Sequence, residues 1–238
     1  MKPNLTLAET KTPDGARMTL VEQDGNYCIR INGQQLMHSA VSASEVELGR
    51  LGCENFTRKN NGTRVLIGGL GLGFTLRSVL ATVGGNAAIH VAELMPAIVA
   101  WNSTFLAGLN GKLLGDRRVS VRVEDVRATI RRAAEKPYDV ITLDVDNGAA
   151  GLVQQDNNQL YSERGVQQIV RALNPGGRVA MWSACSDATI ERRLRQAGLS
   201  VRAVPAKLYP QAKRSACMIY LADKPTERVE PKRTKNSR

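Results

Sequence analysis

Hydrophobic and polar positions follow different patterns in the two parts of the chain. Near the N-terminus, short apolar runs at 18–21 and 27–31 flank the turn residues Asp24-Gly25, and Asn32-Gly33 provides a second turn. Asp-Gly and Asn-Gly between alternating apolar positions are typical of β-hairpins. We therefore expect a small N-terminal β-hairpin extension over residues 1–40.

A helix is predicted next, over 42–54, because Ser42 and Glu45 have the spacing of a capping box. From residue 63 onward, apolar runs alternate with amphipathic segments, and Asn174-Pro175-Gly176-Gly177 is a stop signal between two of them. The predicted strands are 64–68, 88–92, 119–123, 138–143, 177–182, 200–204 and 216–221, and the predicted helices are 74–82, 96–107, 126–134, 162–173 and 188–197.

This alternation favours an α/β fold in which a mostly parallel sheet of these seven strands carries helices on both faces. We assign residues 41–224 to such a Rossmann-like domain. Ligands of open α/β sheets bind at the carboxyl ends of the strands. The candidate functional residues are therefore those that directly follow a strand.

Composition narrows the classes of protein. The 238 residues are 42% hydrophobic, enough for a proper core. No stretch approaches about 18 apolar residues, and the N-terminus has no apolar leader, so we expect a cytoplasmic protein without a membrane span. Four widely spaced cysteines without a C-x-x-C pair, and only two histidines, give no support to a metal site.

The net charge of +11 favours anionic partners. Part of it lies in residues 225–238, a polar segment with five basic and two acidic residues that we expect to be a flexible basic tail. Aromatic residues make up only 4% of the chain, and no basic run is interleaved with them. Nucleic-acid binding is therefore not expected.

The sharpest local feature is the segment 68–73, GGLGLG, which follows a predicted strand and precedes a helix. Glycines let the backbone turn tightly and approach a ligand, and a helix start supplies free N–H groups. The dinucleotide fingerprint fails because Phe74 occupies its last glycine position, and no Gly-Lys-Ser/Thr of a P-loop follows. What remains is G-x-G-x-G at Gly69, Gly71 and Gly73, a form associated with nucleoside sulfonium cofactors such as S-adenosylmethionine.

Three carboxylates follow later strands. Glu93 stands where an acid would accept hydrogen bonds from both ribose hydroxyls of an adenosine. Asp125 would accept from the adenine amino group, cap the next helix, or do both. Asp144 would orient an acceptor amine, take its proton or attract the sulfonium; a helix or turn cap is the alternative.

Other residues are candidates for the acceptor end of such a site. Asp146 would raise the proton affinity of Asp144 if their side chains shared a face. Tyr161 would line the acceptor pocket, or simply pack at a helix entrance. Weaker candidates for substrate contact or proton transfer are Gln34, Gln35 and His38.

From Leu36 to about Leu221, the chain resembles the spermidine synthase-like group of class I S-adenosylmethionine-dependent transferases. The match is carried by residues 65–77, VLIGGLGLGFTLR, by the strand-end residues Glu93 and Asp125, and by the segment 143–148. The resemblance implies the class I methyltransferase fold. It also implies S-adenosylmethionine, or its decarboxylated form, as co-substrate, with no metal. A homodimer is expected by analogy alone.

The resemblance also implies a role for each matched residue. Gly69, Gly71, Gly73 and Glu93 would hold the methionine-derived tail and the ribose of the donor, and Asp125 the adenine. Asp144 matches the aspartate that helps to deprotonate the attacking amine. The aminopropyltransferases of the group continue with a second aspartate and a proline, where this chain has Asn147-Gly148.

We therefore expect an enzyme that moves an alkyl group from an S-adenosylmethionine-type sulfonium to a small-molecule nucleophilic acceptor. Asn147 and the charge of +11 favour methyl transfer, because a polyamine would be repelled unless the pocket is locally acidic. Aminopropyl transfer from decarboxylated S-adenosylmethionine, which makes a polyamine, is the first alternative. The second is a non-catalytic module that binds RNA or protein through its arginines; Glu93, Asp125 and Asp144 together argue against it.

Overall fold

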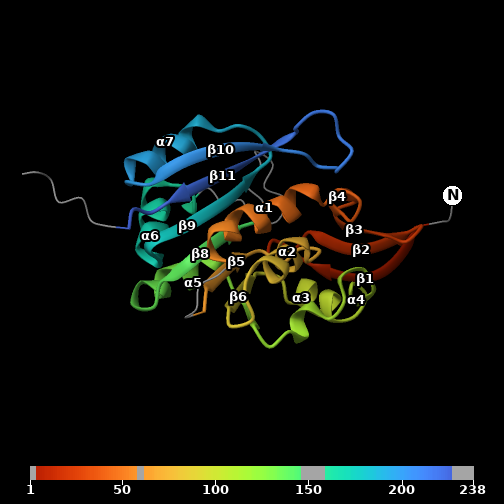
Figure 1. Ribbon diagram of the computed structural model, residues 1–238. Coiled ribbons are helices and arrows are strands. Elements are labelled where there is room, and N and C mark those ends of the chain that lie inside the picture. Colours follow the sequence, from red (N-terminus) through yellow and green to blue (C-terminus); the bar gives the residue numbers. More distant parts are fainter. Residues whose placement is uncertain (1–3, 58–61, 146–158, 227–238) are drawn as a thin grey trace, which may run out of the picture.

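Two sheets form the molecule, and the computed structural model describes residues 4–57, 62–145 and 159–226 (Figure 1). The first sheet is antiparallel, with its strands in chain order: β1 (Leu5–Lys11), β2 (Arg17–Gln23), β3 (Asn26–Ile31) and β4 (Gln34–His38). It extends the predicted hairpin by β1, a strand that the sequence analysis did not identify.

Both predicted turns of this sheet are confirmed. Asp24 and Asn32 each have φ of +49°, and the glycines that follow them have φ of +77° and +82°. Two consecutive residues with positive φ form the two-residue turn whose twist matches that of the flanking strands. The dipeptides Asp-Gly and Asn-Gly thus set the register of the sheet.

The second sheet has seven strands, as the apolar pattern predicted, and their order is β10-β11-β9-β8-β5-β6-β7. β5 to β9 run parallel, whereas β11 is antiparallel to both β9 and β10. One predicted boundary is wrong: Leu173 already pairs with Tyr138, so the stop signal at 174–177 lies inside β9 beside a register shift. The strands are β5 (Arg64–Gly68), β6 (Ala88–Glu93), β7 (Val119–Val123), β8 (Tyr138–Leu143), β9 (Leu173–Ser183), β10 (Ser200–Ala206) and β11 (Cys217–Asp223).

The helices follow the predicted pattern with small differences. The predicted helix 96–107 is divided into two, because α3 ends at Ser103 and α4 begins at Ala107. The helices are α1 (Ala43–Cys53), α2 (Phe74–Thr82), α3 (Pro96–Ser103), α4 (Ala107–Asn110), α5 (Val126–Arg132), α6 (Glu163–Ala172) and α7 (Ala188–Gln196), with 3-10 turns η1 (Glu54–Phe56), η2 (Leu113–Gly115) and η3 (Ala133–Glu135).

Strands buried on both faces explain the continuous apolar runs. In β5, Val65 and Ile67 join the core formed with α2, α3 and the N-terminal sheet, whereas Leu66 joins the core formed with α5 and α6. Such two-sided burial is characteristic of parallel sheets. α1 lies close to the first of these faces, because a Cβ on Gly52 would be only 2.8 Å from the Thr142 side chain.

The register brings the ends of four strands to one edge of this sheet. Gly68 pairs with both Ala92 and Leu143, and Leu143 pairs with Met181. The chain leaves β5 for β6 on one side and later returns to β8 on the other. This is the topological switch point, at which open α/β sheets bind ligands.

Candidate active site

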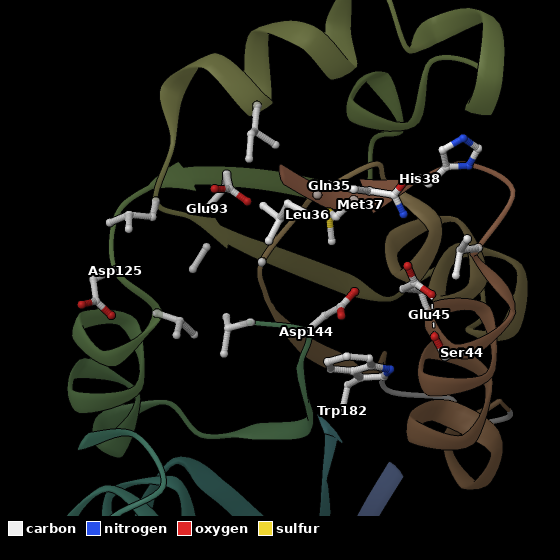
Figure 2. Close-up of a pocket in the computed structure, with 18 of the residues that line it drawn as sticks. Gln35, Leu36, Met37, His38, Ser44, Glu45, Glu93, Asp125, Asp144 and Trp182 are labelled. Atoms are coloured by element: carbon white, nitrogen blue, oxygen red, sulfur yellow. Dashed lines mark hydrogen bonds between the residues drawn. The ribbon is translucent and has the colours of Figure 1, made fainter. Parts of the chain in front are cut away.

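A cavity of about 330 Å³ lies at this edge of the sheet. Figure 2 shows Glu93 and Asp125 toward one end of it, Glu45, Ser44 and Trp182 toward the other, and Asp144 between them. Among its lining residues are Gln35, Leu36, Met37, His38, Val41, Ser44, Glu45, Gly69, Gly71, Glu93, Glu124, Asp125, Asp144, Trp182 and Leu208.

Two of the three predicted glycines line the cavity. Gly69 has φ of +88°, and a Cβ there would lie 2.3 Å from the carbonyl oxygen of Asp144, so no side chain fits. Gly71, with φ of +50°, lies against the Met37 side chain, which a Cβ would approach to 2.6 Å. Gly73 precedes α2 as its N-cap residue and faces Asn102, outside the lining of the cavity.

Glu93 is buried at the end of β6, with 5% of its surface exposed. Its Oε2 accepts a hydrogen bond from the backbone N–H of Leu70, and its Oε1 accepts one from Met95, over 2.7 and 2.8 Å. Burial raises the pKa of Glu93, while these backbone N–H groups act in the opposite direction. The carboxylate lies against the glycine loop, where the ribose of an adenosine was predicted.

Asp125 caps α5. Its Oδ1 accepts from the backbone N–H of Arg127, and its Oδ2 from the guanidinium of the same residue, both over 2.8 Å. The capping interpretation is therefore confirmed. Asp125 also lines the cavity beside Glu124, so the contact with adenine stays a prediction.

Asp144 directly follows β8 and is held from two sides. Its backbone N–H donates to the carbonyl of Gly68 over 2.8 Å, and its Oδ2 accepts a hydrogen bond of 2.6 Å from Thr75 Oγ1. Burial raises the pKa of Asp144 to about 6, although the bond from Thr75 lowers it. A carboxyl group with such a pKa exchanges its proton near neutrality, as a general base must.

Glu45, in the first turn of α1, is a site residue that the sequence analysis missed. The predicted capping box is wrong: Ser42 makes no hydrogen bond from its side chain to the helix start. Glu45 Oε2 instead accepts from Ser44 Oγ over 2.7 Å, and the side chain lines the cavity. Burial, followed by the charge of Asp144, raises the pKa of Glu45 to about 7.

A signal for Glu45 was present in the sequence. Residues at spacings of three, four and seven share one face of a helix. Glu45 therefore shares a face with Leu48, Gly49 and Gly52, all of them buried. A carboxylate on an otherwise apolar helix face is uncommon, because Glu is almost never fully buried unless it is paired.

Strand β4 covers the cavity from the N-terminal sheet. Gln35, Leu36, Met37 and His38 all belong to the lining, whereas Gln34 does not. His38 Nδ1 accepts a hydrogen bond from the backbone N–H of Ala40 over 3.1 Å. The N-terminal extension is thus part of the cavity wall.

Asp146 and Tyr161 are the two remaining candidates for the acceptor end of the site. Asp146 lies outside the described residues. Tyr161 is 4% exposed and packs in the core with residues of α6 and α7, while its carbonyl accepts a hydrogen bond from Arg193 over 2.9 Å. The structure does not bring Tyr161 to the cavity lining. This is the packing role that the sequence left open.

Over residues 4–57, 62–145 and 159–226, no group of three or more His, Cys, Asp or Glu side chains is placed to hold a metal ion. The four cysteines are free thiols, and three of them are buried. None of the helices in these ranges has both the length and the apolar character needed to cross a membrane.

No protein-family model matches the chain, and no curated protein matches it either. Solved structures do. Spermidine synthase from Thermotoga maritima is similar with a TM-score of 0.71 and 18% identity, over 98% of this chain and 79% of that one. A spermidine synthase in complex with the transition state analogue AdoDATO has a TM-score of 0.68 and 16% identity, with the same coverage.

A methyltransferase-like structure is also similar. Human methyltransferase-like protein 13, in complex with SAH, has a TM-score of 0.55 and 19% identity, over 80% of this chain and 83% of that one. At identities this low, the structural similarity establishes the fold alone. The chain therefore has the Rossmann-like fold of the spermidine synthase-like, class I S-adenosylmethionine group that its glycine loop and strand-end acids resemble.

Proposed function

We propose that the protein transfers an alkyl group from an S-adenosylmethionine-type sulfonium to a small acceptor that carries an amine. One observation carries the proposal: a single cavity has Gly69, Gly71 and Glu93 toward one end and Glu45 at the other, with Asp144 between them. Its volume of about 330 Å³ lies in the range of small-molecule sites.

The donor would occupy the end formed by the glycine loop and Glu93. There the backbone of Gly69 and Gly71 leaves room for the methionine-derived tail, and Glu93 would accept from the ribose hydroxyls. Adenine would lie beside Asp125 and Val126, which follow β7. With this order along the edge of the sheet, the sulfonium would lie next to Asp144.

The acceptor would react by direct displacement. Its neutral amine nitrogen attacks the carbon attached to sulfur, the carbon–sulfur bond breaks with its electrons going to sulfur, and the sulfonium becomes a neutral thioether. Asp144 would take the proton that the amine loses before attack. Alignment of nitrogen, carbon and sulfur would supply most of the rate.

The charge of the cavity supports an amine acceptor. Its described lining includes Glu45, Glu93, Glu124, Asp125 and Asp144, but no lysine or arginine. Residues 146–158, outside the described part, contain none in sequence either. Glu124 and Asp125 pair with Arg132 and Arg127, so the local negative charge comes from Glu45, Asp144 and Glu93. These carboxylates would attract a cationic acceptor although the chain as a whole carries +11.

The transferred group would be either methyl or aminopropyl, and one observation favours each. Asn147, in place of a second aspartate, favours methyl transfer. The lack of a basic side chain in the described lining favours aminopropyl transfer. The carboxylate of S-adenosylmethionine would find no cationic side chain in the described lining and would lie near carboxylates, whereas the decarboxylated donor carries only an ammonium group in its tail.

Two measurements test the proposal. Calorimetry with S-adenosylmethionine and with its decarboxylated form should give binding heat for at least one donor; if neither binds at millimolar concentration, the proposal fails. Each donor is then incubated with a panel of primary amines. Release of S-adenosylhomocysteine identifies methyl transfer, and amine-dependent release of methylthioadenosine identifies aminopropyl transfer.

A further inference from the structure

We infer that Glu45 is a second acceptor-binding carboxylate, and that the ammonium group of the acceptor binds between Glu45 and Asp144. The inference rests on the proposed function and deepens it, because it names the groups that select the acceptor. On this view α1 supplies a carboxylate in place of the second aspartate of the resembled aminopropyltransferases, at whose position this chain has Asn147.

The packing of α1 brings Glu45 to the cavity. Gly49 and Gly52 allow the helix to approach α2 and β8 closely, since a Cβ on either would lie 2.8 Å from the nearest side-chain atom. Glu45 is on the same face of the helix. Thr75 of α2 links the two carboxylate-bearing segments: its Oγ1 is 2.6 Å from Asp144 Oδ2 and 3.3 Å from the carbonyl oxygen of Glu45.

The surroundings of Glu45 are unfavourable for a purely structural carboxylate. Glu45 is half-buried, and a charge largely withdrawn from water normally has an opposite charge beside it. The charged group that most affects Glu45 is Asp144, a like charge. Arg50 of the same helix pairs instead with Glu47 and Glu54, over 2.7 and 3.4 Å. A bound cation between the two carboxylates would relieve this repulsion.

The remaining neighbours fit the alkyl part of an amine. Trp182 at the end of β9, Val41 and Leu208 line the same cavity, and Figure 2 shows Trp182 beside Asp144 and Glu45. An indole attracts a cation over its face and packs against methylene groups. Two other titratable groups are near: His38 of β4 lines the cavity, and Cys217 of β11 interacts with Ser44 and Glu45. Because Trp182, Val41 and Leu208 offer an apolar surface beside the two carboxylates, we expect the acceptor to be a primary amine on a short aliphatic chain.

The Glu45–Asp144 pair would take up and release one proton in each reaction. The acceptor enters as an ammonium ion and gives one proton to the carboxylate pair. The neutral nitrogen then forms the new carbon–nitrogen bond while the carbon–sulfur bond breaks toward sulfur. The product leaves as an ammonium ion, and the pair returns its proton to solvent. No further reactant is needed.

The test measures binding of 1,4-diaminobutane by calorimetry at pH 8, with the full-length protein saturated with methylthioadenosine. Glu45→Gln should weaken binding of the amine about tenfold or more, while affinity for methylthioadenosine changes by less than about threefold. Glu47→Gln is the matched control, because Glu47 is on the same helix, outside the cavity lining and paired with Arg50. The Glu47→Gln variant should bind the diamine like the wild type. The neutral analogue 1,4-butanediol should bind to neither of these two proteins.

The outcomes separate the two proposals. Equal affinity of Glu45→Gln and wild type for the diamine, or no binding of the diamine by the wild type, overturns the inference. Amine binding that depends on Glu45, in a protein that binds neither sulfonium donor, supports the inference and contradicts the proposed function. Glu45→Asp keeps the charge and should recover part of the lost affinity, which provides a second folded variant for the comparison.

Discussion

Glu93 Oε2 accepts a hydrogen bond of 2.7 Å from the backbone N–H of Leu70, so the carboxylate at the end of β6 holds the glycine loop in place. Glu93→Ala would leave this N–H group and that of Met95 without their acceptor. We expect donor affinity to fall at least about tenfold, and the free energy of unfolding to fall by roughly 1–3 kcal/mol. Calorimetry and urea denaturation measure the two effects. Unchanged donor affinity would contradict the assignment of Glu93 to the ribose.

Asp144→Asn should slow transfer about 10²- to 10⁴-fold, the usual contribution of a general base, while donor affinity stays within a few-fold. Single-turnover rates and calorimetry separate these quantities. An unchanged rate would mean that Asp144 is only structural.

Thr75→Val tests how the proton affinity of Asp144 is controlled. The hydrogen bond from Thr75 stabilises the ionised carboxylate, so its loss should raise the pKa of Asp144 further above about 6. Because transfer needs the ionised form, the rate of the wild type should fall as pH drops through about 6. The acid limb of the variant should lie at higher pH. A pH profile with an unmoved limb would exclude this role.

The raised pKa of Glu45 has a consequence for stability. Because its pKa rises from the ordinary 4.5 to about 7 on folding, the folded chain binds this proton more tightly than the unfolded chain. The associated stability is present below pH 4.5 and is lost as pH rises through about 7. Glu45→Gln should therefore raise the free energy of unfolding at pH 8 by roughly 1–2 kcal/mol, with the gain disappearing near pH 4.

Urea denaturation at the two pH values measures this difference. Glu47→Gln is again the control, because the hydrogen bond from Arg50 lowers the pKa of Glu47. That variant should gain no stability at pH 8. A gain of equal size in both variants would point to a general effect of surface charge.

Gly69→Ala should abolish donor binding, because a Cβ at this residue would lie 2.3 Å from the carbonyl oxygen of Asp144. Gly15→Ala is a matched control: Gly15 has nearly the same φ, +87° against +88°, but has no neighbouring atom within 4 Å of the added Cβ. Backbone strain alone should cost the control about 1 kcal/mol. Thermal melts and calorimetry on both variants distinguish strain from collision, and equal losses would contradict the close approach.

Much of the fold could be predicted from the sequence because its signals are local. Strand β5 is a short apolar run that ends at Gly68, and Asp24-Gly25 specifies a hairpin turn by itself. The residues at strand ends, such as Glu93 and Asp144, could be assigned to one edge because parallel strands share a direction. Their predicted contacts with the donor and the acceptor follow from that placement.

What the sequence left out depends on contacts between distant segments. Glu45 has the spacing of a capping box, but the close packing of α1 on β8 directs its side chain to the cavity. Trp182 of β9 and Leu208, which follows β10, line the cavity through the arrangement of distant strands in the sheet. β1 was missed because the polar residues Thr6, Glu9, Thr10 and Lys11 weaken the apolar pattern of Leu5–Lys11.

Met37 lies against Gly71, so a strand of one sheet covers a loop of the other. Each sheet has its own hydrogen-bonded ladder, and the cavity lies where the two meet. A molecule that fills it contacts both, and its binding free energy is added to the adhesion between them. Ligand binding and the packing of the N-terminal sheet are therefore thermodynamically coupled: a substitution that weakens the packing of β4 on the second sheet should also weaken the binding of whatever molecule occupies the cavity.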